Sequence, residues 1–133
     1  MAKINKASLI RAAARARRSA VSPYSKFQVG AALLTRTGEI ITGANVESAS
    51  YSLTCCAERV ALFTALASGK KTFVAVAVVA RTPGGPTPCG ACRQLLAEYA
   101  PDAKVYVADS RALNRIRVFS VRDLLPDPFL DLP

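Results

Sequence analysis

The chain has 133 residues, 51% of them hydrophobic, and its 18 Lys and Arg against 9 Asp and Glu give a formal net charge of +9. This length and apolar content exclude an intrinsically disordered protein and predict one domain, residues 1–133, with a core of its own. No apolar run approaches the roughly 18 residues of a membrane-spanning helix, and the N-terminus lacks the apolar stretch of a signal peptide. We therefore expect a cytoplasmic protein with no membrane partner.

The first half of the chain predicts a helix followed by a β-hairpin. Residues 3–19 are rich in helix formers and have one apolar side, which is typical of an amphipathic helix. The segment 22–25, Ser-Pro-Tyr-Ser, ends it. Residues 27–34 and 39–43 are apolar or alternating and flank Thr37-Gly38, which predicts two antiparallel strands.

The second half alternates helices with strands. Helices are expected at 56–67, where Ser68-Gly69 follows as a stop, at 90–99 and, briefly, at 121–125. Residues 73–80 are almost wholly apolar and predict a strand buried on both faces, and 104–108 and 115–119 predict two more. The whole order predicts an α/β protein with three layers, α/β/α, in which helices cover both faces of a mixed five-stranded sheet.

The cysteines are the first candidates for chemistry. The chain has no histidine, so a metal site must use thiolates and carboxylates. Cys89 and Cys92 lie three residues apart at a predicted helix start, a spacing that serves either a metal clip or a redox pair. With Cys56 they would give zinc three ligands and leave its fourth position open for water. Cys55 is not expected to join, because adjacent cysteines rarely face one ion from a regular backbone.

Glu58 is the only carboxylate close in sequence to these cysteines and is the candidate general base and acid. Residues two apart do not share a helix face, so Cys56 and Glu58 can act together only if Cys56 lies at the helix cap. The competing interpretation is a first-turn glutamate that merely favours the helix dipole.

Five ordered motifs carry a resemblance to a known family. They are Tyr24-Ser25-Lys26-Phe27, Gly43-Ala44-Asn45-Val46-Glu47, Cys56-Ala57-Glu58-Arg59, the segment from Pro88 to Gln94, and Leu124-Leu125-Pro126 with Phe129. From about residue 14 to 129 the chain resembles the zinc-dependent nucleoside and nucleobase deaminases, and most closely the small homotetrameric cytidine deaminases. Two departures are Ala44, where the family often has cysteine, and Ser48, where it often has asparagine.

The resemblance implies the cytidine deaminase-like fold and one zinc ion per subunit, held by Cys56, Cys89 and Cys92 with Glu58 as acid and base. The implied reaction is hydrolytic deamination of cytidine or 2′-deoxycytidine to uridine or deoxyuridine plus ammonia, within pyrimidine salvage. Arg59 would offset the negative charge of three thiolates. The implied partners are a nucleoside and three further copies of the chain that share active sites. The substrate-binding residues would be Phe27, Asn45, Glu47, Ala49, Tyr51, Ala57 and Phe129.

Three alternatives remain open from the sequence. One is a deaminase for another nucleoside, such as blasticidin S. Another is a non-catalytic, zinc-stapled basic module that binds nucleic acid, which the charge of +9 favours. The third is a redox protein that uses Cys89 and Cys92. We interpret the basic stretches 11–18 and 111–122 as solvated faces and expect no nucleic-acid partner.

Overall fold

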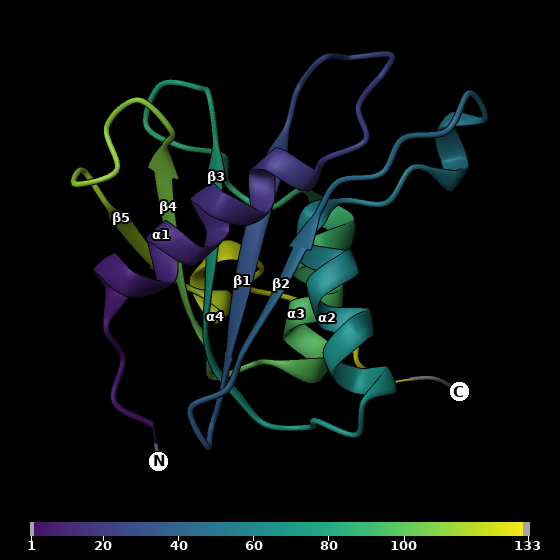
Figure 1. Cartoon of the computed structure of the whole chain (residues 1–133). Coiled ribbons are helices and arrows are strands. Elements are labelled where there is room, and N and C mark those ends of the chain that lie inside the picture. Colours follow the sequence, from purple (N-terminus) through teal and green to yellow (C-terminus); the bar gives the residue numbers. More distant parts are fainter. Residues whose placement is uncertain (1, 132–133) are drawn as a thin grey trace.

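A computed structural model describes residues 2–131, and its centre is one five-stranded sheet (Figure 1). In spatial order the strands are β2 (Ile40–Ala44), β1 (Val29–Thr35), β3 (Phe73–Ala80), β4 (Lys104–Asp109) and β5 (Arg117–Ser120). Only β3 and β4 run parallel, and the other neighbours are antiparallel. The predicted mixed sheet is therefore confirmed.

Helices cover both faces of this sheet, which confirms the three-layer prediction. The helix α1 (Lys6–Ala16) crosses one face and continues into the short 3₁₀ turn η1 (Arg17–Ser19). The helices α2 (Ala57–Ala67), α3 (Gly90–Tyr99) and α4 (Val121–Leu124) lie on the other face. A second 3₁₀ turn, η2 (Tyr51–Leu53), lies in the long connection between β2 and α2, which extends away from the sheet in Figure 1.

The alternation of side chains along the strands separates two hydrophobic cores. On the α1 face, Leu9 and Ile10 pack with Leu34, Val79 and other strand residues. On the opposite face, strand residues pack with all three helices α2, α3 and α4. All eight residues of β3 are buried, as expected for a central strand covered on both sides.

A glycine lets α2 approach the sheet closely. A Cβ atom on Gly43 in β2 would lie 2.5 Å from the backbone nitrogen of Ala61 and 2.6 Å from the carbonyl oxygen of Ala57. Real Cβ atoms do not tolerate such contacts with backbone, so any side chain at Gly43 would push α2 outward. Gly43 thereby determines how closely α2, which begins directly after Cys56, packs against the sheet.

Two strands begin two residues later than the sequence patterns predict. The first starts at Val29 rather than residue 27, because Lys26 has a left-handed backbone (φ 61°) and the N–H of Phe27 donates to the hydroxyl of Ser25 at 2.9 Å. The last starts at Arg117 rather than residue 115, because the N–H of Arg115 donates to the carbonyl of Ala112 in a local turn. Local hydrogen bonds outcompete sheet pairing at both places.

Within residues 2–131, none of the helices is long and apolar enough to cross a membrane.

Candidate active site

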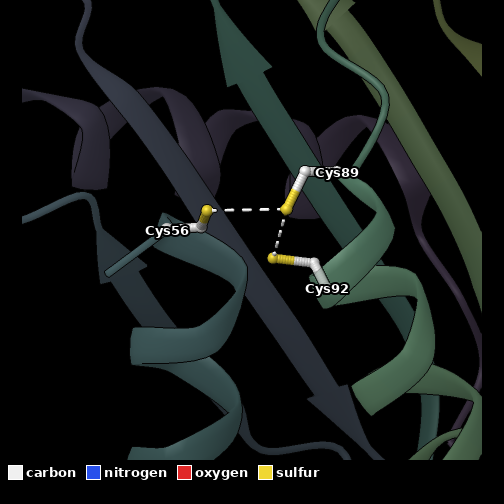
Figure 2. Close-up of side chains that lie close together, drawn as sticks. All are labelled: Cys56, Cys89 and Cys92. Atoms are coloured by element: carbon white, nitrogen blue, oxygen red, sulfur yellow. Dashed lines mark hydrogen bonds between the residues drawn. The ribbon is translucent and has the colours of Figure 1, made fainter. Parts of the chain in front are cut away.

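Three sulfur atoms meet where the N-termini of α2 and α3 come together (Figure 2). The Sγ atoms of Cys56 and Cys89 are 3.8 Å apart, and those of Cys89 and Cys92 are 3.5 Å apart. All three lie within 4.8 Å of one another. The structure thus brings together the three cysteines that the sequence singled out, although Cys56 and Cys89 are 33 residues apart.

Both helices begin immediately after a cysteine, and this places the sulfurs. Cys56 is the N-cap of α2 and Cys89 the N-cap of α3, each with extended backbone (ψ 153° and 168°). An extended N-cap residue turns its side chain across the end of the helix, where the free N–H groups and the positive end of the helix dipole favour a thiolate. The predicted cap position of Cys56 is confirmed.

The donor set fits one zinc ion. A tetrahedral zinc site with Zn–S bonds of about 2.3 Å holds its sulfurs about 3.8 Å apart, close to the two distances between sulfurs here. Three protein ligands leave one position for water, as catalytic zinc sites do. The sulfur of Cys55 lies outside the group, and burial raises the pKa of its thiol. Cys55 therefore does not convert the site into a closed four-cysteine centre.

The carboxyl group of Glu58 lies in the first turn of α2 and is only 7% exposed. Burial raises its pKa to about 7, because the charged form loses contact with water. A carboxyl group with a pKa near neutrality can both accept and donate a proton at physiological pH. The alternative of a first-turn glutamate that merely favours the helix dipole does not account for this burial.

Arg59 contacts the sulfur cluster directly. Its Nη2 atom donates to the Sγ of Cys56 at 3.5 Å and to the carbonyl of Thr54 at 3.1 Å. The hydrogen bond from Cys92, followed by that from Arg59, lowers the pKa of the Cys56 thiol to about 5. The guanidinium thus stabilises negative charge on sulfur, the chemistry that three thiolates around one zinc ion require.

Arg93, the other arginine near the cysteines, points elsewhere. Its Nε donates to the carbonyl of Pro88 at 2.7 Å and its Nη1 to that of Leu124 at 3.0 Å. Arg93 therefore ties the residue before Cys89 to the end of α4 and makes no hydrogen bond to a sulfur.

The carboxylate of Glu47 is held in a fixed position by the turn before β1. Its Oε1 accepts from the backbone N–H groups of Tyr24 and Ser25 at 3.0 and 3.1 Å, and its Oε2 accepts from the Ser25 hydroxyl. These bonds, that of the hydroxyl first, hold the pKa of Glu47 below its usual value. Glu47 is therefore an ionised acceptor with a defined orientation.

Asn45 is buried and bridges the start of β1. Its Nδ2 donates to the carbonyl of Phe27 at 2.8 Å, and its Oδ1 accepts from the N–H of Val29 at 2.9 Å. The amide has two N–H groups, so one remains available to a ligand. The Phe27 ring beside it is 41% exposed and is thus not a core residue.

A cleft of about 360 Å³ lies beside these residues. Its walls are Tyr24, Ser25, Glu47, Ser48, Tyr51 and Thr54. Thr54 also accepts the hydrogen bond from Arg59 and so joins the cleft to the sulfur cluster. The cleft is of the size that small ligands occupy.

Comparison with known proteins decides the family. Residues 3–108 match the family model described as "Cytidine and deoxycytidylate deaminase zinc-binding region". The chain belongs to this family. A cytidine deaminase of Halalkalibacterium halodurans is 52% identical over 122 residues, 91% of each chain. The crystal structure of a cytidine deaminase from Burkholderia pseudomallei superposes with a TM-score of 0.90 at 49% identity, over 95% of this chain and 100% of that one.

A relative with another substrate in its name also matches. A blasticidin-S deaminase of Bacillus cereus is 34% identical over 110 residues, 77% of this chain and 76% of its own. Family membership therefore identifies the deaminase chemistry and the zinc site more sharply than it identifies the nucleoside.

The predicted substrate-binding residues are not all brought together within one chain. Glu47 and Tyr51 line the cleft, whereas Phe27, Asn45, Ala49 and Ala57 are absent from its walls, and Ala57 is fully buried in α2. Phe129 lies in the C-terminal tail and is 62% exposed, and Tyr51 is 77% exposed. Exposed aromatic rings of this kind are typical of surfaces that another chain covers.

Three residues that position this deaminase site have no individual role that the sequence motifs indicate. Ser25 orients Glu47, Thr54 orients Arg59, and Gln94 in α3 bonds the backbone of Phe129. Ser25 and Gln94 lie inside the motifs that carry the family resemblance, and their place in these motifs could have indicated a role in the site. No pattern pointed to Thr54, because its contribution is a backbone carbonyl that any residue would supply.

Proposed function

We propose that this chain is a zinc-dependent deaminase that hydrolyses cytidine or 2′-deoxycytidine to the corresponding uridine and ammonia. The observation that carries the proposal is the buried carboxyl group of Glu58 beside three sulfur atoms at two converging helix N-termini. The names of the relatives at 52% and 49% identity support cytidine as the nucleoside.

Cys56, Cys89 and Cys92 would hold the zinc ion. When bound, zinc lowers the pKa of a coordinated water toward neutrality and so supplies the nucleophile at C4 of the pyrimidine. Glu58 takes a proton from the water and delivers it to ring N3, and water oxygen adds to C4. Glu58 then takes the proton from the new C4 hydroxyl and transfers it to the 4-amino group, which leaves as ammonia while C4 becomes a carbonyl carbon. One carboxyl group thus serves as base and then as acid.

Asn45 and Glu47 would bind the sugar. The ionised, fixed carboxylate of Glu47 accepts a hydrogen bond from the ribose 3′-hydroxyl, and Asn45 offers its remaining N–H. A free base would leave this carboxylate without its partner, so the site favours nucleosides. The exposed ring of Phe27 would stack on the pyrimidine, and Tyr51 would contribute to the wall of the cleft.

A nucleoside such as blasticidin S is the second candidate substrate, because a relative of that name is 34% identical. Rates on cytidine, deoxycytidine and blasticidin S, measured with one preparation, separate the two. A blasticidin S rate above both cytidine rates would replace the first assignment with the second. A non-catalytic nucleic-acid module and a dithiol redox protein both lack a reason to bury Glu58.

The decisive experiment follows the conversion of cytidine to uridine by the zinc-loaded protein, with Glu58→Gln as control. The variant keeps the shape of the side chain but cannot exchange protons, so we expect a rate loss of about 10²-fold or more with zinc retained. If the unmodified protein with stoichiometric zinc left every nucleoside unchanged, the proposal would be wrong.

We also propose a homotetramer with shared active sites, in which Phe129 of one subunit completes a pocket of its neighbour. The exposed rings of Tyr51 and Phe129 and the outward course of the β2–α2 connection support it. If so, mixing refolded Glu58→Gln and Phe129→Ala chains restores activity in about one quarter of the sites. No restoration, or a monomer by light scattering, would contradict sharing. Residues 1–133 would act as one domain in the cytoplasm, in pyrimidine salvage.

A further inference from the structure

A second cavity, of about 510 Å³, has walls that include none of the residues proposed for catalysis. Its walls are Pro83, Gly84, Asp109, Ala112, Arg115, Ile116 and Arg117. It opens where β3 and β4, the parallel pair, end side by side at Ala80 and Asp109. The crevice beyond the carboxyl ends of parallel strands is where α/β sheets commonly bind ligands, because loops diverge there and leave space.

Positive charge without an acidic partner gathers at this cavity. Asp109 is the only carboxylate in its walls, and Arg111 neutralises it in an ion pair of 2.6 Å. The Arg111 guanidinium, and at longer range Arg81, hold the pKa of Asp109 below its usual value. Within the described residues, Arg81, Arg115 and Arg117 form no ion pair. The cavity therefore presents a net positive field to an incoming anion.

Arg117 is held in position without an ion pair to a carboxylate of the described residues. Its guanidinium lies 5.0 Å from the centre of the Phe119 ring and donates to the carbonyl of Gly84 at 3.3 Å. Gly84 has a left-handed backbone (φ 76°), and a Cβ atom there would lie 3.2 Å from Nη1 of Arg117. Stacking and one backbone hydrogen bond leave other N–H groups of the planar guanidinium free. Two such N–H groups can donate side by side to two oxygens of one phosphate group.

We propose that this cavity binds the phosphate groups of a small nucleotide. Arg115 and Arg117 supply the phosphate contacts, while Pro83 and Ile116 supply an apolar wall for the remainder of the ligand. The volume lies within the range of about 300–1,000 Å³ that is typical of small-ligand sites, which favours a mononucleotide over an extended strand. The proposal does not depend on the deaminase assignment, because the two sites share no residue.

The test measures binding by calorimetry to the zinc-loaded protein with three probes: inorganic triphosphate, ATP and a mixed-sequence single-stranded DNA 10-mer. Triphosphate contains no nucleoside and so cannot be mistaken for a ligand of the Glu47 cleft. The test variant is Arg115→Gln/Arg117→Gln. The matched control is Arg36→Gln/Lys71→Gln, which removes two exposed cations at the opposite end of β3.

We expect triphosphate and ATP to bind, with an affinity loss of about 10-fold or more in the test variant and little loss in the control. Cytidine turnover of the test variant should stay unchanged. Equal losses in both double variants would show a general charge effect and overturn the proposal. It would equally be overturned if neither triphosphate nor ATP bound, or if the oligonucleotide alone bound through these arginines.

Discussion

The side-chain amide of Gln94 makes a reciprocal pair of hydrogen bonds with the backbone of Phe129. Its Nε2 donates to the Phe129 carbonyl at 2.5 Å, and its Oε1 accepts from the Phe129 N–H at 3.1 Å. Gln94 lies in α3, two residues after Cys92. The helix that carries two of the three sulfurs therefore also positions the tail and its exposed ring.

We expect Gln94→Ala to raise the KM for cytidine by about 5-fold, because two partly exposed hydrogen bonds that hold the tail are lost. The kcat should change less, since Gln94 does not touch the sulfur cluster. Steady-state kinetics measure both constants. Glu98→Ala, an exposed position one turn along the same helix, is the control and should leave KM unchanged. A KM that stays the same in Gln94→Ala would show that the tail position is irrelevant to substrate.

Arg59→Ala should weaken zinc retention and turnover by about 10- to 100-fold, because the thiolate charge loses its hydrogen-bonded cation. Arg59→Lys keeps the charge, but its shorter, more strongly hydrated ammonium group is held less firmly between Cys56 and the Thr54 carbonyl, so it should give an intermediate loss. Competition with a chelator measures retention. If Arg59→Ala matched the parent chain in both assays, the compensating role would be wrong.

Gly43→Ala should destabilise the fold by about 1–3 kcal/mol, because its methyl group would meet the backbone of α2. Outward movement of α2 would also displace Cys56 and Glu58, so activity should fall by more than the loss of folded protein explains. Chemical denaturation and the specific activity of the folded fraction test the two statements. Thr42→Ala, on the neighbouring exposed position of β2, should have little effect on either.

Ser25→Ala should raise the pKa of Glu47, because the hydroxyl is the largest influence that lowers it. The pKa of Glu47 is lower in the folded chain than in the unfolded chain. The stabilisation from the bonds to its ionised carboxylate is therefore fully present above the pKa of the unfolded chain, and it is lost as the pH falls through the pKa of the folded chain. The variant therefore loses ionised Glu47 at a higher pH than the parent chain does. A carboxyl-carbon NMR titration measures the shift.

Ser48→Ala is the matched control for Ser25→Ala. Ser48 also lines the cleft, but its hydroxyl accepts from the N–H of Ser50, and the hydrogen bonds to the Glu47 carboxylate come from Tyr24 and Ser25. Its removal should leave the titration of Glu47 unchanged. Equal shifts in the two variants would mean that general polarity of the cleft, and not the Ser25 bond, controls Glu47.

The sequence by itself determined the order of helices and strands, because these depend on periodicity and on residues within a few positions of each other. The patterns match β3 and α3 to the residue, and the spacing of Cys56 and Glu58 implied the helix cap that is found. The errors at residues 27 and 115 arose where a local hydrogen bond competed with sheet pairing, which no pattern of apolar residues reports.

Only the tertiary structure decided which distant groups meet. Ser25 and Glu47 are 22 residues apart, Gln94 and Phe129 are 35 apart, and the arginine cavity joins the loops after β3 and β4. Burial of Glu58 is likewise a product of packing, since an identical first-turn glutamate on an open helix would stay solvated with an ordinary pKa. Local preferences are encoded in neighbouring residues, whereas desolvation and long-range hydrogen bonds exist only after the sheet and its helices have assembled.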